Sequence, residues 1–138
     1  DHIKLVETLF PREWLERISM AQGRSCDVVP MMEGRFDLVY IDGDHTYGAV
    51  KTDWDLVKDR FDQFVIFDDY YKSESTTAHD VAVARAVDEI ASEYERELII
   101  MDRLLFVDDR GDVNKDYGQV ILRKPGFVDP IDEYAHNW

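Results

Sequence analysis

Two apolar segments of the chain each run into residues that could do chemistry. The groups that follow them are Asp42, Asp44 and His45 after residues 36–41, and Asp68 and Asp69 after residues 64–67. Carboxylates are the ligands that hard divalent cations such as Mg²⁺ prefer, and a neighbouring carboxylate or imidazole can act as a general base. These residue types therefore indicate metal-assisted removal of a proton from a hydroxyl group.

The elements around these groups are predicted to bring them together. Residues 36–41 form a nearly continuous apolar run, which is typical of a strand buried on both faces of a parallel sheet. Residues 48–61 have a helical period, and residues 64–67 read as the next strand. Such a crossover makes the two strands parallel neighbours, about 4.8 Å apart. Ligands of open α/β sheets bind outside the carboxyl ends of the strands, so we expect one crevice to contain both groups.

Each group also has an interpretation that needs no ligand. Asp42 could cap the following turn, with Gly43 allowing an unusual backbone angle. Asp68 and Asp69 could be a solvated loop, and His45 could be a hydrogen-bonded structural histidine. The two endings together favour a cation site, because several carboxylates in one crevice repel each other unless a cation is present.

The remaining segments complete an α/β pattern. The predicted elements are a helix over residues 3–18 that is broken at Pro11, a short strand at 18–21, a turn of helix capped by Ser25 or Asp27, a helix over 78–95, and an antiparallel strand pair within 98–123. The residues from 125 onward are polar and irregular. Sequence alone does not decide whether Tyr47, Tyr70 and Tyr71 line a pocket or pack beneath the loops.

Composition narrows the function classes. The chain has 138 residues, which fits one domain, and a net charge of −14, which argues against binding a nucleic-acid backbone or an anionic membrane. Its apolar segments are too short for a membrane span, and the first residues do not resemble a signal peptide. The single Cys26 suits a reducing compartment, so a cytoplasmic location is expected.

The combined motif, IDGDH-x-Y followed by a strand that ends in DDY, resembles the class I S-adenosylmethionine-dependent methyltransferases. Within that class it looks most like the metal-dependent O-methyltransferases that act on small molecules, over residues 18–123. The resemblance implies a Rossmann-like sheet with helices on both faces and an antiparallel strand pair at its end. It also implies S-adenosylmethionine and Mg²⁺, or another divalent cation, as cofactors.

The resemblance carries roles onto individual positions. The metal ligands would be Asp42, Asp68 and Asp69. The general base would be Asp44 or His45. Gly23 and Ser25 of the QGRS turn, together with Asp42, would contact the methyl donor. The acceptor would be a small hydroxylated molecule such as a sugar, a polyol or a catechol.

One part of the family pattern has no counterpart in the chain. The glycine-rich turn after the first strand is expected upstream of the motifs, but the first glycine is Gly23. We therefore expect a partial methyltransferase-like domain over residues 1–124, without the N-terminal strands, followed by a polar tail over 125–138. The exposed sheet edge would invite a second copy, giving a homo-oligomer. Two alternatives stay open: a catalytically inactive binding module and a hydroxylase-like relative.

Overall fold

The computed structural model describes residues 8–70, 78–100, 106–107, 113–114 and 118–127. The chain divides into two compact units, Asp1–Met32 and Glu33–Trp138. No helix in the described part of the chain is long and apolar enough to cross a membrane. Of the predicted polar tail, residues 128–138 lie outside the described residues.

Within its described residues, 8–32, the first unit contains short helices. Its elements are α2 (Arg12–Leu15), α3 (Ser25–Val28) and the 3₁₀ turn η1 (Val29–Met31). Residues 8–9 and α2 are helical on either side of Pro11, so the predicted break at Pro11 is confirmed. The second half ends at Leu15, earlier than the predicted end at residue 18, and it buries no side chain. The predicted strand at 18–21 does not form. The helical turn at Ser25 is confirmed, but no side chain caps it.

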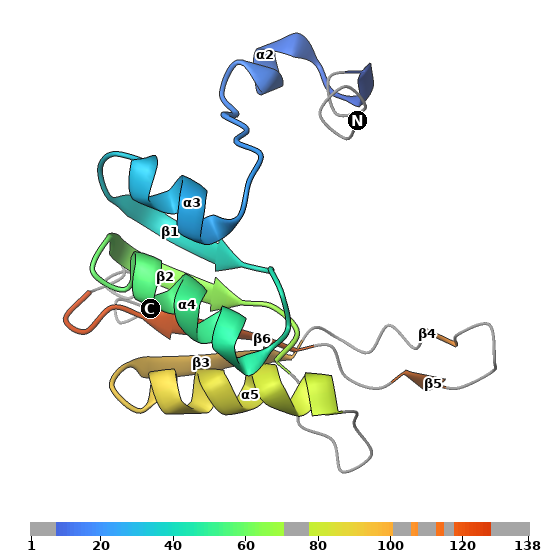
Figure 1. The fold of residues 1–138 in the computed structure, drawn as a ribbon, viewed down its shortest axis with the longest axis vertical. Helices are drawn as coiled ribbons and strands as arrows, with labels where there is room; N and C mark the ends of the chain where they lie inside the picture. Colours follow the sequence, from blue (N-terminus) through green and yellow to red (C-terminus); the bar gives the residue numbers. More distant parts are fainter. Residues whose placement is uncertain (1–7, 71–77, 101–105, 108–112, 115–117, 128–138) are drawn as a thin grey trace, which may run out of the picture. The chain divides into compact units, whose positions relative to one another are not determined.

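The second unit is built on a four-stranded mixed sheet (Figure 1). In spatial order its strands are β1 (Phe36–Ile41), β2 (Phe61–Phe67), β6 (Gly118–Arg123) and β3 (Glu95–Ile100). The parallel pairing of β1 with β2 is confirmed, and so is the antiparallel pair, in which β6 lies between β2 and β3. A separate two-stranded sheet joins β4 (Phe106–Val107) and β5 (Val113–Asn114).

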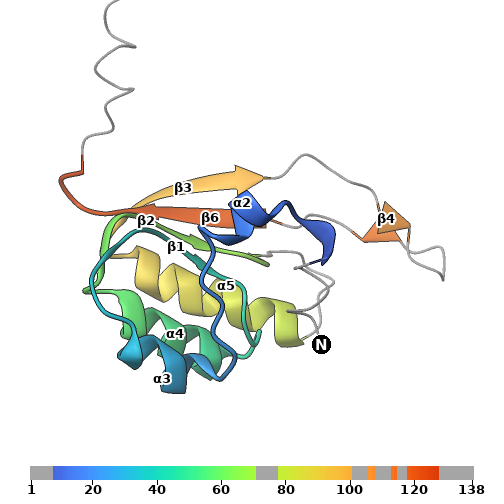
Figure 2. The same ribbon diagram turned by 90° about the horizontal axis from the view of Figure 1, so that it is seen from above.

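Two helices cover one face of this sheet. Figure 2 shows α4 (Tyr47–Val57) and α5 (Ala78–Ala91) side by side beneath the strands. Their buried residues include those that the helical period predicts, namely Val50, Trp54, Val57, Val83, Val87 and Ile90. The helix α4 ends earlier than predicted, so that Phe61 begins β2 instead.

The centre of the core is aromatic. The ring of Trp54 on α4 lies 5.9 Å from Phe61 and 6.1 Å from Phe67, which are both on β2. Tyr94 closes the cluster, with its ring edge-on to Trp54 at 5.3 Å. Offset and edge-on pairs of this kind add to the stabilisation that burial provides. This cluster therefore fixes α4 on β2, the strand that directly precedes Asp68.

The strand β1 departs from the expectation of burial on both faces. Ile41 faces the helices and is buried, whereas the alternate residues Leu38 and Tyr40 are 50% and 46% exposed. The physical reason is the position of β1 at the edge of the four-stranded sheet. Among the described residues of this unit, moreover, no helix lies on the face that Leu38 and Tyr40 share.

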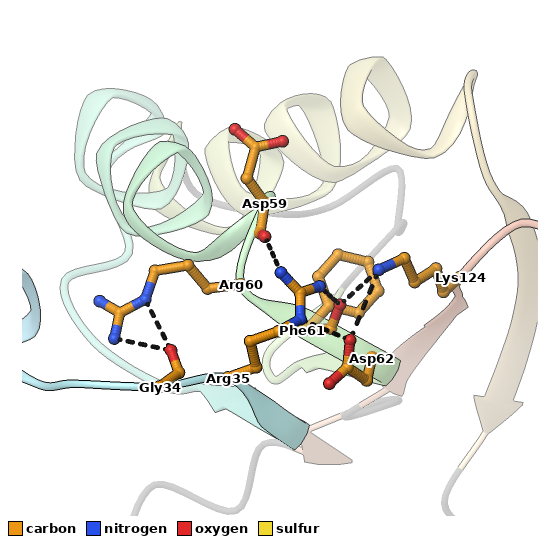
Figure 3. A network of polar contacts seen from close by, with 7 residues as sticks. All are labelled: Gly34, Arg35, Asp59, Arg60, Phe61, Asp62 and Lys124. Carbon is orange, nitrogen blue, oxygen red and sulfur yellow. Dashed lines mark hydrogen bonds and ion pairs between the residues drawn. The ribbon is translucent and has the colours of Figure 1, made fainter.

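An arginine network holds the amino ends of β1 and β2 (Figure 3). The guanidinium of Arg35 donates to the Asp62 carboxylate at 2.6 Å and to the carbonyls of Asp59 and Phe61 at 2.6 and 2.9 Å. Lys124 donates to the same Phe61 carbonyl at 2.9 Å. The hydrogen bond from Arg35 lowers the pKa of Asp62, so this carboxylate stays ionised in mildly acidic solution. These contacts join the two strands at the end opposite to Asp42 and Asp68, and the register is irregular between Phe36 and Leu38.

We predict that Trp54→Ala lowers the free energy of unfolding by about 3–5 kcal/mol, because it leaves a cavity among three aromatic rings. Trp14→Ala is the matched control, since Trp14 is 58% exposed, and it should change the value by less than about 0.5 kcal/mol. Urea unfolding followed by circular dichroism measures both. Equal effects of the two substitutions would contradict this description of the core.

Candidate active site at the carboxyl ends of β1 and β2

Register brings the two acidic groups to one edge of the sheet. Ile41 pairs with Phe67 as the last residue pair of β1 and β2, and the amide of Asp68 donates to the carbonyl of Ile41 at 3.0 Å. The residues that follow each strand, Asp42 and Asp68, therefore leave the sheet side by side. The expected convergence of the two endings is confirmed.

Three side chains from these endings converge. One ligand atom from each of Asp42, His45 and Asp69 lies within 4.8 Å of the others. The Nε2 atom of His45 is 2.9 Å from a carboxylate oxygen of Asp69 and 3.9 Å from one of Asp42. All three side chains are partly accessible to solvent, and Asp69 is the most covered. This acidic cluster has His45 where the resemblance implies Asp68.

Asp68 points to a different set of partners. Its Oδ2 atom accepts a hydrogen bond from the Tyr40 hydroxyl, and its Oδ1 atom accepts one from the Gln119 amide at 3.4 Å. The Gln119 amide also donates to the Tyr40 hydroxyl at 2.8 Å. The hydrogen bond to Asp68 raises the pKa of Tyr40 to about 12, so the hydroxyl remains a donor at neutral pH.

The backbone separates the two consecutive aspartates. Asp69 has φ 53°, in the left-handed region that residues other than glycine rarely adopt. Its amide donates to the Oδ1 atom of Asp68 at 2.9 Å. A left-handed residue at this point turns the Asp69 side chain toward His45 while Asp68 stays with Tyr40. No motif in the sequence indicates this angle, and none singles out Tyr40 or Gln119.

The turn before α4 is made by residues other than Asp42. The Oδ1 atom of Asp44 accepts from the amide of Thr46 at 2.8 Å, and the Thr46 hydroxyl caps α4 by accepting from the amide of Ala49. The capping role that could have explained Asp42 therefore belongs to Asp44 and Thr46. Gly43 does not have the positive φ considered for it.

A glycine in β6 fixes the turn after β2. A Cβ atom on Gly118 would lie 2.6 Å from the carbonyl oxygen of Tyr70, which is too close for any other residue. The approach permits the hydrogen bond from the Tyr70 amide to the carbonyl of Gly118 at 2.9 Å. The chain is thus fixed immediately after Asp68 and Asp69.

The helix α5 holds both loops of the site through two tyrosines. Tyr47 donates to Glu89 at 2.6 Å, and Tyr70 donates to Asp88 at 2.8 Å. Tyr70 is only 4% exposed, so it packs beneath the loops and does not line an open pocket. Tyr71 lies outside the described residues. Neighbouring residues of one helix therefore brace the segment after β1 and the segment after β2.

Two of the residues predicted to contact the methyl donor, Gly23 and Ser25, lie in the first unit. A Cβ atom on Gly23 would lie 2.6 Å from the Val28 side chain, so glycine allows the turn to approach α3 closely. Ser25 is the first residue of α3, and Arg24 pairs with Asp27 at 2.8 Å across that turn. The role of Gly23 and Ser25 in donor binding stays a prediction.

Comparison with known proteins agrees with this architecture. A family model described as a methyltransferase domain matches residues 4–70, a range that contains β1, α4 and β2 and ends in the DDY motif. A crystal structure from Klebsiella pneumoniae, described as that of "a putative O-methyltransferase", matches with a TM-score of 0.51 and 14% sequence identity. The match covers 78% of this chain and 50% of that one, so the chain spans about half the length of that structure. No curated protein matches the sequence.

The chain therefore has the Rossmann-like fold of the class I S-adenosylmethionine-dependent methyltransferases. The family model, which covers just under half of the chain, agrees with the sequence-based recognition of that class, and the structural match supports the fold. The metal-dependent subgroup and the individual site residues stay predictions.

We predict that Tyr70→Phe lowers the free energy of unfolding by about 1.5 kcal/mol, because the buried ring stays but the hydrogen bond to Asp88 is lost. Tyr47→Phe should cost less, since the Tyr47–Glu89 hydrogen bond is exposed to solvent. Thermal and urea unfolding of both variants test the ranking. A larger loss for Tyr47→Phe would contradict the bracing role of the buried tyrosine.

Proposed function

We propose that the protein is an S-adenosylmethionine-dependent O-methyltransferase in which Asp42 and Asp69 bind a divalent cation. The acceptor is a small hydroxylated molecule, such as a sugar, a polyol or a catechol. The observation that supports this proposal is the convergence of two carboxylates and an imidazole at the carboxyl ends of neighbouring parallel strands. The methyltransferase fold supplies the reaction class.

The donor atoms fit a divalent cation. Asp42 and Asp69 belong both to the ligand set that the resemblance implies and to the acidic cluster in the structure. Carboxylate oxygens suit Mg²⁺, and an imidazole nitrogen broadens the choice to Mn²⁺ and other transition metals. The third ligand is then either His45 or Asp68. The structure favours His45 as this ligand, because His45 belongs to the acidic cluster. Asp68 is less favoured, because both of its carboxylate oxygens accept hydrogen bonds from Tyr40 and Gln119.

His45 is the better-placed candidate for the general base. Its Nε2 atom is 2.9 Å from the Asp69 carboxylate, and a carboxylate partner both orients an imidazole and stabilises its protonated form. Asp44, the other candidate, has one carboxylate oxygen bonded to the amide of Thr46. If His45 instead binds the cation, Asp44 is the candidate that takes the proton.

The residues of the chain would act by position and charge. When bound, a divalent cation lowers the pKa of a hydroxyl that it contacts, and S-adenosylmethionine supplies the methyl group. His45 or Asp44 would accept the hydroxyl proton, and the acceptor oxygen would receive the methyl group as S-adenosylhomocysteine leaves. The hydrogen bonds from Tyr47 and Tyr70 to α5 keep both loops in place during this step.

The donor set does not favour the hydroxylase-like alternative. Non-haem iron oxygenases use two histidines and one carboxylate, whereas the acidic cluster contains one histidine and two carboxylates. The inactive-module alternative makes a different prediction, because such a module would transfer no methyl group. Methyl-transfer activity therefore separates it from the proposed enzyme.

We predict that methyl transfer requires the cation and both shared carboxylates. The assay measures release of S-adenosylhomocysteine with a panel of sugars, polyols and catechols, in the presence of Mg²⁺ or Mn²⁺. A chelator, Asp42→Asn or Asp69→Asn should each lower kcat/KM about 100-fold or more, because several kcal/mol of charge stabilisation are lost. His45→Gln and Asp68→Asn, compared in the same assay, show which residue completes the site.

Asp37→Asn is the matched control, because Asp37 is an exposed carboxylate near the amino end of β1, the strand that precedes Asp42. Its activity should equal that of the wild type. Activity that survives both the chelator and Asp42→Asn would contradict the metal assignment. Absence of transfer with every acceptor, together with absence of S-adenosylmethionine binding in calorimetry, would contradict the enzyme itself.

A further inference from the structure

Three neighbouring strands each supply one member of a closed hydrogen-bonded triangle. Tyr40 comes from β1, Asp68 follows β2, and Gln119 comes from β6. Tyr40 and Gln119 both donate to Asp68, and Gln119 donates to Tyr40 as well. Both oxygens of the Asp68 carboxylate therefore have partners on the strands that flank it.

The register of the sheet makes this triangle a consequence of the fold. Phe67 pairs with Val120 across the antiparallel β2–β6 ladder, so Asp68 and Gln119 are opposite each other one step further on. Val120 is buried toward the helices, which places Gln119 on the other face of the sheet. Tyr40 lies on that same face, because its neighbour Ile41 is buried toward the helices.

The chemical type of the two donors is informative. Tyr40 and Gln119 are neutral, so they stabilise the ionised Asp68 without placing a positive charge beside Asp42 and Asp69. An arginine or lysine at either position would compete electrostatically with a cation at the acidic cluster. Neutral donors hold the carboxylate in place and leave the negative charge of the site intact.

We propose that Tyr40 and Gln119 are positioning residues that fix the direction of Asp68 and thereby present Asp69 to Asp42 and His45. Asp68 is the link, because its Oδ1 atom accepts the amide of Asp69, whose left-handed backbone turns the next carboxylate toward His45. This inference rests on the proposed function for its catalytic consequence. The positioning itself can be measured without catalysis.

The test is hydrogen exchange of the Asp69 amide, measured by NMR in the whole chain. Tyr40→Phe and Gln119→Leu should each make exchange at Asp69 roughly fivefold faster, the factor that corresponds to a weakened hydrogen bond. On an Asp68→Asn background the same two substitutions should add almost nothing, because they act through that carboxylate. Tyr94→Phe removes the hydroxyl of a ring that packs near Phe61 at the start of β2, and it should leave exchange at Asp69 unchanged.

Cation binding gives a second readout. Calorimetry with Mn²⁺ should show affinity about 10- to 100-fold weaker in the Tyr40→Phe, Gln119→Leu double variant than in the wild type. Unchanged exchange at Asp69 would overturn the positioning role, and so would a uniform rise in exchange throughout β1 and β2. If the wild type binds no Mn²⁺, the metal assignment fails, while the exchange at Asp69 still decides the positioning role.

Discussion

The structure of the site depends on one constraint, the parallel pairing of β1 with β2 that ends at Ile41 and Phe67. Any residue that follows these strands must share the same edge of the sheet. Carboxylates follow both strands at this edge, so the fold brings several negative charges close together. Their mutual repulsion must be offset by other groups. The fold achieves this by giving the consecutive aspartates different partners, neutral donors for Asp68 and an imidazole for Asp69.

The rest of the second unit keeps that constraint in place. The aromatic cluster around Trp54 holds α4 on β2, and the Arg35 network joins the two strands at their opposite end. Hydrogen bonds from Tyr47 and Tyr70 to α5 limit the movement of the two loops. The core packing, the contacts between the strands and the tyrosine hydrogen bonds together keep the functional side chains close to one another.

Much of this arrangement could be predicted from the sequence, because it follows from local patterns. The apolar runs predicted β1 and β2, the helical period predicted the buried faces of α4 and α5, and the position of carboxylates after both strands predicted their convergence. Before residue 18 the sequence predicted the break at Pro11, but not that α2 would end at Leu15 and bury no side chain. The sequence could not show which partners Asp68 and Asp69 would each contact. That depends on the left-handed angle at Asp69 and on the register that brings Gln119 beside Asp68, which no local pattern encodes.

The central claim is that Asp42 and Asp69 form a divalent-cation site. The most direct measurement is a crystal structure of the protein with Mn²⁺, with data collected to record the anomalous scattering of the metal. The account predicts an anomalous peak bound by carboxylate oxygens of Asp42 and Asp69, with His45 or Asp68 beside it. An acidic cluster without a peak at saturating Mn²⁺, or a peak only at other carboxylates, would contradict the account.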